Sequence, residues 1–260
     1  MILRRLTQSL KEQNWTAIVI EFVLLVVGVF LGIQVSNWND ANNDRLVVDK
    51  YLADITADVR SDIDELARTR RSALSRISAS TYLLRQAGVP IQKSGAELTQ
   101  PDQTGIFAGF EQVTIPEVAV PPASQRSHLW QAITTVYMYD PNRSAYDALV
   151  SSGRIELIDD PRITRALREY YFVVTSLALS QQRTIAPIKQ QVIDAGIAHG
   201  HAAWGNSDEA VLVEQVRREP AFAAMVATSR QLSGYQLLMC NVNEKKAREL
   251  LSLLEKRSAP

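Results

Sequence analysis

Three short motifs combine residue types that could bind a metal or support catalysis. His199-Gly200-His201 is a histidine pair, but no carboxylate or cysteine lies at ligand spacing, which favours a solvated helix end. Asp159-Asp160-Pro161 holds a carboxylate pair, yet an aspartate before proline is typical of a helix start. Ser151-Ser152-Gly153 lacks the preceding strand of a nucleophile elbow and the glycine two residues before the serine. None of these motifs predicts an active site.

Longer enzyme motifs are also missing from the sequence. There is no P-loop, no dinucleotide-binding fingerprint and no H-E-x-x-H zinc motif. Cys240 is the only cysteine, so an internal disulfide is excluded, and its apolar neighbours predict a buried thiol. We therefore expect a protein that is not an enzyme and that holds no cofactor and no metal.

The densest group of aromatic residues lies between positions 130 and 171. At helical spacing such residues usually form a core, but polar aromatic groups can also line a ligand pocket. The sequence leaves both interpretations open, and a pocket would be bounded by Tyr137, Tyr146 and Tyr171. The remaining members of the group are Trp130, Tyr139 and Tyr170.

One carboxyl, that of Glu21, lies within the longest apolar segment of the chain, residues 16–38. At about 1.5 Å per residue, this segment makes a helix of roughly 34 Å, against a hydrocarbon core of about 30 Å. Trp15 and Trp38 flank it, as aromatic residues do at membrane interfaces. The segment is longer than the apolar part of a cleavable signal peptide, so we predict an uncleaved signal anchor.

The predicted membrane helix carries a distinctive face. With 100° of rotation per residue, Gly28 and Gly32 fall within about 40° of Glu21. The G-x-x-x-G spacing lets two helices approach closely in lipid, and an intramembrane acid favours a partner. The alternative is that Glu21 simply reaches water at the nearer edge of the bilayer. We interpret Glu21, Gly28 and Gly32 as a helix interaction face.

Charge predicts the orientation and limits the partners. Arg4, Arg5 and Lys11 precede the span, whereas Arg45 and Lys50 follow it among several aspartates, which places residues 1–15 in the cytosol. The predicted main domain, residues 39–260, is then periplasmic or extracellular. The chain has 28 basic and 28 acidic residues, so no global field attracts nucleic acid. The expected partners are the lipid bilayer and either a second copy or another membrane protein.

Hydrophobic periodicity predicts a mainly α-helical fold. Apolar residues recur at three- and four-residue steps from Leu46 to Leu84, which predicts one helix continuous with the membrane span. The opposite side of this helix should be solvated, and its expected charges are Asp54, Asp58, Arg60, Asp62, Asp64, Glu65, Arg68, Arg70 and Arg71.

Proline and glycine interrupt this pattern in residues 89–127, which predicts an irregular insertion in which 113–115 and 118–120 could form a short β-hairpin. Helical spacing resumes over residues 128–139 and continues in several helices to about residue 256. We expect an antiparallel helical bundle standing on the membrane.

Two stretches resemble a large family of uncharacterised single-span bacterial membrane proteins. The first is EFVLLVVGVFLGIQVSNWND, in which the resemblance rests on Glu21, Gly28, Gly32, Asn37, Trp38, Asn39 and Asp40. The second, residues 145–171, matches at Tyr146, Leu149, Ser152, Gly153 and Tyr171. Ser36, where the family more often has asparagine, and Gly32, where alanine is common, are small departures. The resemblance covers most of the chain and implies a location in the bacterial inner membrane, but the family brings no known activity.

Two functions follow as hypotheses. The first is a membrane-anchored scaffold or protein-interaction module that associates through its membrane helix. The second is an extracytoplasmic ligand-binding sensor. A tail of about fifteen residues cannot house a kinase or cyclase, so such a sensor would have to signal through a partner chain.

Overall fold

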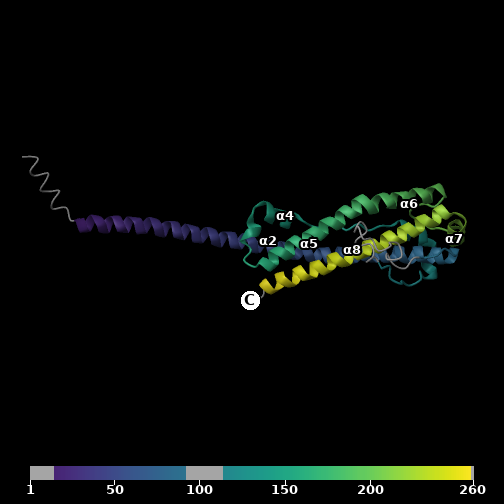
Figure 1. The fold of residues 1–260 in the computed structure, drawn as a ribbon, viewed down its shortest axis with the longest axis horizontal. Coiled ribbons are helices and arrows are strands. Elements are labelled where there is room, and N and C mark those ends of the chain that lie inside the picture. Colours follow the sequence, from purple (N-terminus) through teal and green to yellow (C-terminus); the bar gives the residue numbers. More distant parts are fainter. Residues whose placement is uncertain (1–14, 92–113, 259–260) are drawn as a thin grey trace, which may run out of the picture.

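The computed structural model describes residues 15–91 and 114–258, and it is dominated by one long helix, α2. Helix α2 runs without interruption through the 73 residues Trp15–Ala87, a length of about 110 Å. Its first part projects alone from the rest of the molecule, and its second part forms one side of a bundle (Figure 1). The prediction that the apolar span continues directly into an amphipathic helix is confirmed.

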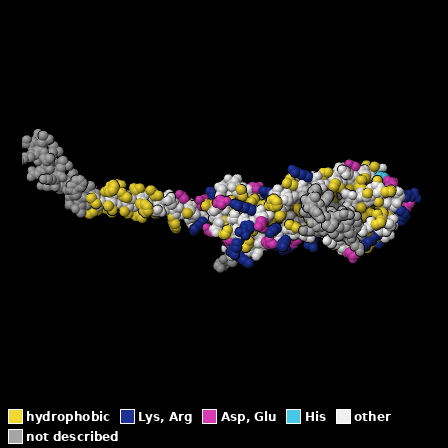
Figure 2. All heavy atoms as spheres, in the orientation of Figure 1, with side chains coloured by type: hydrophobic (Ala, Val, Ile, Leu, Met, Phe, Trp, Pro, Cys, Tyr) yellow, Lys and Arg dark blue, Asp and Glu magenta, His cyan; other side chains and the backbone are white. Residues whose placement is uncertain are grey.

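The first part of α2 is long and apolar enough to cross a membrane. On the face drawn in Figure 2, hydrophobic side chains cover most of the projecting helix, and charged side chains gather where it approaches the bundle. Side chains 19–43 are exposed, and Val48 is the first fully buried residue of the helix. An all-round apolar surface without covering protein is what a lipid-facing helix requires.

Two further long helical elements complete the bundle. Helix α8, Pro220–Ser258, packs along α2, and α5, Pro161–Ser180, packs along α8. Ion pairs from Arg257 to Asp49 and from Arg60 to Glu255 show that α8 runs antiparallel to α2. The carboxyl end of α8 therefore lies where α2 leaves the bundle (Figure 1). All regular structure in the described residues is helical, so the predicted mainly α antiparallel bundle is confirmed.

Shorter helices close the far end and the flank of the bundle. The α-helices are α3 (Leu129–Thr134), α4 (Ser144–Ser151), α6 (Ala186–Ala198) and α7 (Glu209–Arg218). Two 3₁₀ turns, η3 (Ala123–His128) and η4 (Arg154–Leu157), join them, and the π-helical turn η5 (Gln181–Ile185) links α5 to α6. Pro187 falls in the first turn of α6, directly after the π-helical turn, and the first turn of a helix is where proline is tolerated best.

Several helix ends follow local signals in the sequence. The Asp160 carboxylate accepts a hydrogen bond from the Arg162 amide at 2.8 Å, and Pro161 opens α5. Gly153 ends α4 with a φ of 72°, in the left-handed region that glycine tolerates. These two residues therefore have structural roles at helix ends.

Two predicted elements differ in the structure. The helix expected over residues 128–139 ends at Thr134, and residues 135–143 have no regular secondary structure because side chains from other elements bind their main chain. Of the expected hairpin, residues 118–120 form no strand, because prolines at 116, 121 and 122 limit ladder pairing. Thr114 forms an isolated β-bridge, and Val113 lies outside the described residues. The irregular insertion is otherwise described only at residues 89–91 and 114–127.

Gly196 packs closely against Trp130, and its helix α6 lies at the end of the bundle opposite to where α2 leaves it (Figure 1). A Cβ atom at this position would lie 2.3 Å from Cζ2 of Trp130, a fully buried ring stacked on Phe222 with centroids 5.3 Å apart. The indole therefore needs a residue without a side chain in α6.

We expect Gly196→Ala to destabilise the protein by about 1–3 kcal/mol, because the rigid indole cannot move away. Elsewhere in a helix the same substitution usually stabilises by about 0.5–1 kcal/mol. Urea unfolding of the detergent-solubilised protein measures the change. In a Trp130→Phe background the penalty should vanish, and an equal penalty in both backgrounds would contradict the contact.

Candidate functional site

The predicted interaction face of the membrane helix is open in the structure. A Cβ atom added to Gly28 or Gly32 would meet no atom within 4 Å. The apolar side chains around the two glycines are exposed, including Leu25 at 65 % and Val35 at 64 %. Nothing in the described chain therefore covers this face.

This face also points away from the folded domain. With 100° of rotation per residue, Val48 lies about 180° from Glu21, and Val48 is where α2 enters the core. Leu46 lies only about 20° from Glu21 and is 61 % exposed. A partner helix could thus approach along Glu21, Gly28 and Gly32 without meeting the bundle.

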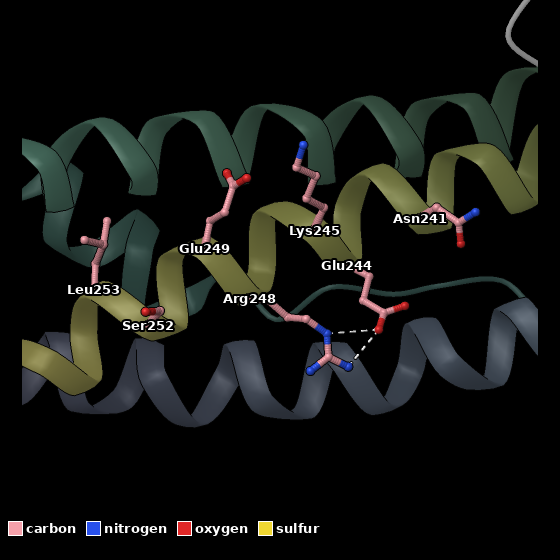
Figure 3. Close-up of a pocket in the computed structure, with 7 residues that line it drawn as sticks. All are labelled: Asn241, Glu244, Lys245, Arg248, Glu249, Ser252 and Leu253. Carbon is pink, nitrogen blue, oxygen red and sulfur yellow. Dashed lines mark hydrogen bonds and ion pairs between the residues drawn. The ribbon is translucent and has the colours of Figure 1, made fainter.

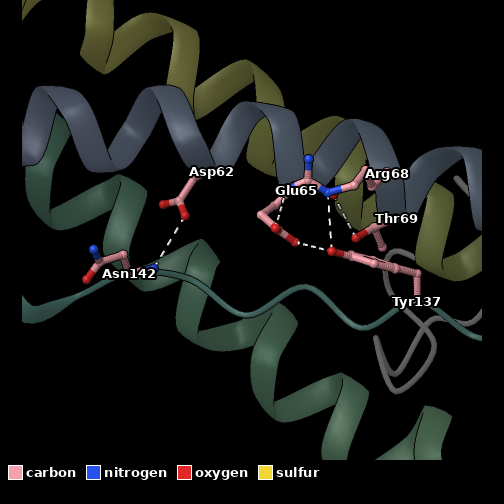
Figure 4. Close-up of polar contacts among 6 residues, drawn as sticks. All are labelled: Asp62, Glu65, Arg68, Thr69, Tyr137 and Asn142. Carbon is pink, nitrogen blue, oxygen red and sulfur yellow. Dashed lines mark hydrogen bonds and ion pairs between the residues drawn. The ribbon is translucent and has the colours of Figure 1, made fainter.

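Asp62 is a buried carboxylate on the bundle side of α2. It is 2 % exposed, and its Oδ2 accepts a hydrogen bond from the Tyr170 hydroxyl at 2.5 Å. The Asn142 amide donates to Oδ1 at 3.4 Å (Figure 4), and no salt bridge to Asp62 is present among the described residues. Burial raises the pKa of Asp62, although the hydrogen bonds from Tyr170, Asn142 and Tyr139 partly oppose the rise. The predicted solvated position of Asp62 is wrong, because its part of the helix faces α5.

Arg76 is the second buried charge of α2, and each of its three nitrogens donates a hydrogen bond. Its Nε donates to Ser233 Oγ at 2.8 Å, and Nη1 donates to Thr135 O at 2.9 Å and to Ser72 Oγ at 3.1 Å. Nη2 donates to Gln236 Oε1. Every acceptor is neutral, and burial lowers the pKa of the guanidinium to about 10.

Both buried charges of α2 hold the same segment, residues 135–143, which we call the strap. The strap has no regular secondary structure, so much of its main chain between the two ends lacks helical or sheet partners, and side chains replace them. Gln181 accepts from the Tyr139 amide at 2.8 Å and donates to the Tyr139 carbonyl at 2.7 Å. Gln236 donates to the Tyr137 carbonyl at 3.1 Å, and Ser72 accepts from the Tyr137 amide at 3.1 Å. The strap is therefore recognised through its main chain by α2, η5 and α8.

An exposed polar group holds the middle of the strap at the surface. The Tyr137 hydroxyl donates to Glu65 Oε2 at 2.8 Å and accepts from Arg68 Nε at 3.2 Å, and Arg68 also pairs with Glu65 (Figure 4). The hydrogen bond from Arg68 lowers the pKa of Glu65. This group is a surface ion pair, which contributes little to stability.

The three tyrosines of the predicted pocket occupy different environments. Tyr146 stacks on Tyr171 with ring centroids 3.9 Å apart, and Tyr171 is 2 % exposed within the core near the membrane end of the bundle. Tyr137 lies instead at the surface, beside Glu65 and Arg68. The structure therefore brings two of the three together in core packing and places the third elsewhere.

Two hollows among the described residues lie away from the three tyrosines. A groove of about 980 Å³ lies between α2 and residues 116–135, and His128 and hydroxyl side chains of α2 are among its lining residues. A second, shallower hollow of about 770 Å³ lies along the outer face of α8 (Figure 3). All its lining residues belong to that one helix, and Arg248 pairs with Glu244 across it. Neither hollow is lined by the three tyrosines.

The other candidate residues have structural contacts. His199 Nε2 pairs with Glu219 at 2.7 Å, and the His201 ring is buried against Trp130. Within residues 15–91 and 114–258, no three His, Cys, Asp or Glu side chains are arranged to hold a metal ion. Cys240 is buried, as predicted, and burial raises the pKa of its thiol to about 12.

Comparison with known proteins gives no further guidance. No family model, curated protein or solved structure matches this chain. The family resemblance of residues 21–40 and 145–171 thus stays a prediction. Function has to be inferred from the open membrane-helix face and from the polar contacts of the strap.

Proposed function

We propose that this protein is a membrane-anchored scaffold that associates, with a second copy or with another membrane protein, through the Glu21, Gly28 and Gly32 face of α2. The observation that carries the proposal is that this face is uncovered and points away from the bundle. Its two glycines permit close backbone approach in lipid. An acid within the span costs about 2.5–3.5 kcal/mol on insertion scales, and a partner on the same face would reduce this cost.

The proposed setting is the bacterial inner membrane, with the N-terminus in the cytosol and the bundle outside it. Basic residues before the span support this orientation. Residues 39–47 would then form a stalk of about 13 Å between the bilayer and the bundle. The resemblance to single-span bacterial membrane proteins supports the same setting.

Cross-linking of the full-length protein in detergent tests this proposal. We expect Gly28→Leu with Gly32→Leu to reduce the cross-linked complex at least about tenfold, which corresponds to a loss of about 1.4 kcal/mol. The matched control is Val26→Leu with Phe30→Leu on the opposite face, which should leave the complex unchanged. Co-purified proteins distinguish a foreign partner from a second copy. Equal cross-linking in both double variants would contradict the proposal.

A sensor that signals through a partner chain is the second candidate. It is favoured by the strap, because a segment held mainly by side chains can change its position without rebuilding a sheet or helix. The described tyrosine stacking supplies no pocket for a ligand. We therefore rank the sensor below the scaffold.

A further inference from the structure

The strap is attached to the bundle by contacts that differ from those holding the helices together. Its main chain is bound by the side chains of Ser72, Arg76, Gln181 and Gln236, and each such hydrogen bond contributes about 0.5–1.5 kcal/mol. Tyr139 is the one fully buried strap residue, whereas residues 136, 138, 141 and 143 are half-buried and residues 135, 137, 140 and 142 are exposed. The strap thus combines few apolar contacts with several separable polar ones.

The helices do not depend on the strap in the same way. Apart from Tyr139, the two main cores consist of residues from the helices and their short connecting turns, and α8 packs directly on both α2 and α5. Segments with little buried apolar area open at a lower free energy than the global unfolding. A local opening of the strap therefore leaves most helix packing in place.

The burial of the Asp62 carboxylate also favours this opening. In the closed structure its carboxylate faces Tyr170 and Tyr171 of α5, Tyr139 and the Asn142 amide of the strap, and Asp58 one turn earlier on α2. Arg143 is directed elsewhere, to Asp147 and Thr175. No cation of the described residues pairs with the carboxylate, and removing the strap would return it to water.

We propose that residues 135–143 form a detachable strap. The strap separates as one segment from α2, η5 and α8 while the helices stay folded. Detachment uncovers the side chains of Asp62, Arg76 and Gln181, which are placed to bind an extended main chain. The bundle therefore has two states, one with the strap bound and one with the strap detached.

Proton binding sets the balance between these two states. Burial raises the pKa of Asp62 in the closed state. Opening of the strap would expose the carboxylate to water, so the closed state binds a proton more tightly than the open state. Protonation therefore favours closure, and rising pH favours opening. The opening constant changes by at most about tenfold per pH unit for one linked proton.

Hydrogen exchange followed by mass spectrometry on the full-length protein in detergent tests the proposal. Strap amides should show lower protection factors than α2 amides beside Arg76, and their protection should fall as pH rises from acidic to neutral. In Asp62→Asn the pH dependence should disappear. Strap and α2 amides that exchange together at every pH would show that only global unfolding exposes the strap, and would overturn the proposal.

A second variant separates the strap from general instability. Gln181→Met removes both hydrogen bonds to Tyr139, so strap protection should fall about tenfold while α2 protection changes little. Gln190→Met, an exposed substitution on α6, is the control. Strap protection that is unchanged by Gln181→Met would contradict detachment through these contacts, whatever the effect of Asp62→Asn.

Discussion

Replacing Asp62 with asparagine is expected to raise the thermal stability of the protein at neutral pH, and the gain should vanish in acid. Burial raises the pKa of the carboxyl, so ionised Asp62 destabilises the folded state. The destabilising effect of Asp62 is absent below the ordinary pKa of a carboxyl. The free energy of unfolding of the wild type then falls as pH rises through the raised pKa of the folded state. Within that window the loss is at most about 1.4 kcal/mol per pH unit.

Asparagine keeps the shape of the side chain and an acceptor for the Tyr170 hydroxyl. The measurement is the difference in melting temperature between Asp62→Asn and wild type across the acidic to neutral range. Asp64→Asn, an exposed substitution on the same helix, is the control and should give a small, nearly flat difference. An Asp62→Asn protein that is less stable than wild type at neutral pH would contradict the unfavourable burial of this carboxylate.

Arg76→Met is expected to have the opposite effect, a loss of about 2–4 kcal/mol at neutral pH. Methionine fills much of the volume but donates no hydrogen bond. The fully buried Gln236 Oε1 and the Ser233 hydroxyl lose their donor, and an unsatisfied buried acceptor costs about 1–3 kcal/mol. The contact to Thr135, which begins the strap, is lost with them.

Urea unfolding of the solubilised protein measures this loss. Arg71→Met, at an exposed position on the same helix, is the control and should change stability by less than about 0.5 kcal/mol. Arg76→Met also removes the desolvation cost of a buried guanidinium. A variant as stable as wild type would show that this cost is as large as the stabilisation from the hydrogen bonds, and would contradict the prediction.

These two buried charges differ in how completely they are compensated. Arg76 makes four hydrogen bonds to groups on α2, α8 and the strap, whereas Asp62 accepts hydrogen bonds from Tyr170, Asn142 and Tyr139 and forms no ion pair among the described residues. A residue that destabilises its own fold suggests a role other than stability. In this protein that role is the control of strap opening.

The main helices were predictable because their signals are local. Apolar residues on one side of residues 46–84 predict α2, and the pair Asp160-Pro161 predicts the start of α5. Gly153 likewise marks the end of α4. These signals depend on neighbouring residues alone, so the sequence shows them directly.

The strap was not predictable, because its partners are distant in the chain. Residues 128–139 have helical spacing, but Arg76 and Gln181 bind the main chain of Thr135 and Tyr139 across 59 and 42 residues. The burial of Asp62 did leave a signal. It lies three residues after Val59 and four before Leu66, both buried, on the stripe that faces the bundle.

The central claim is that two copies, or a copy and a partner, meet on the Glu21, Gly28 and Gly32 face. Disulfide formation in bacterial membranes tests it for a second copy without changing either glycine. Leu25→Cys and Val35→Cys lie on this face, whereas Val23→Cys and Phe30→Cys lie on the opposite one. The wild-type protein, whose only cysteine is the buried Cys240, is the background control.

We predict that oxidation converts the Leu25→Cys and Val35→Cys proteins into linked dimers and leaves the Val23→Cys and Phe30→Cys proteins monomeric. Equal linking at all four positions, or stronger linking at Val23 and Phe30, would contradict association through this face.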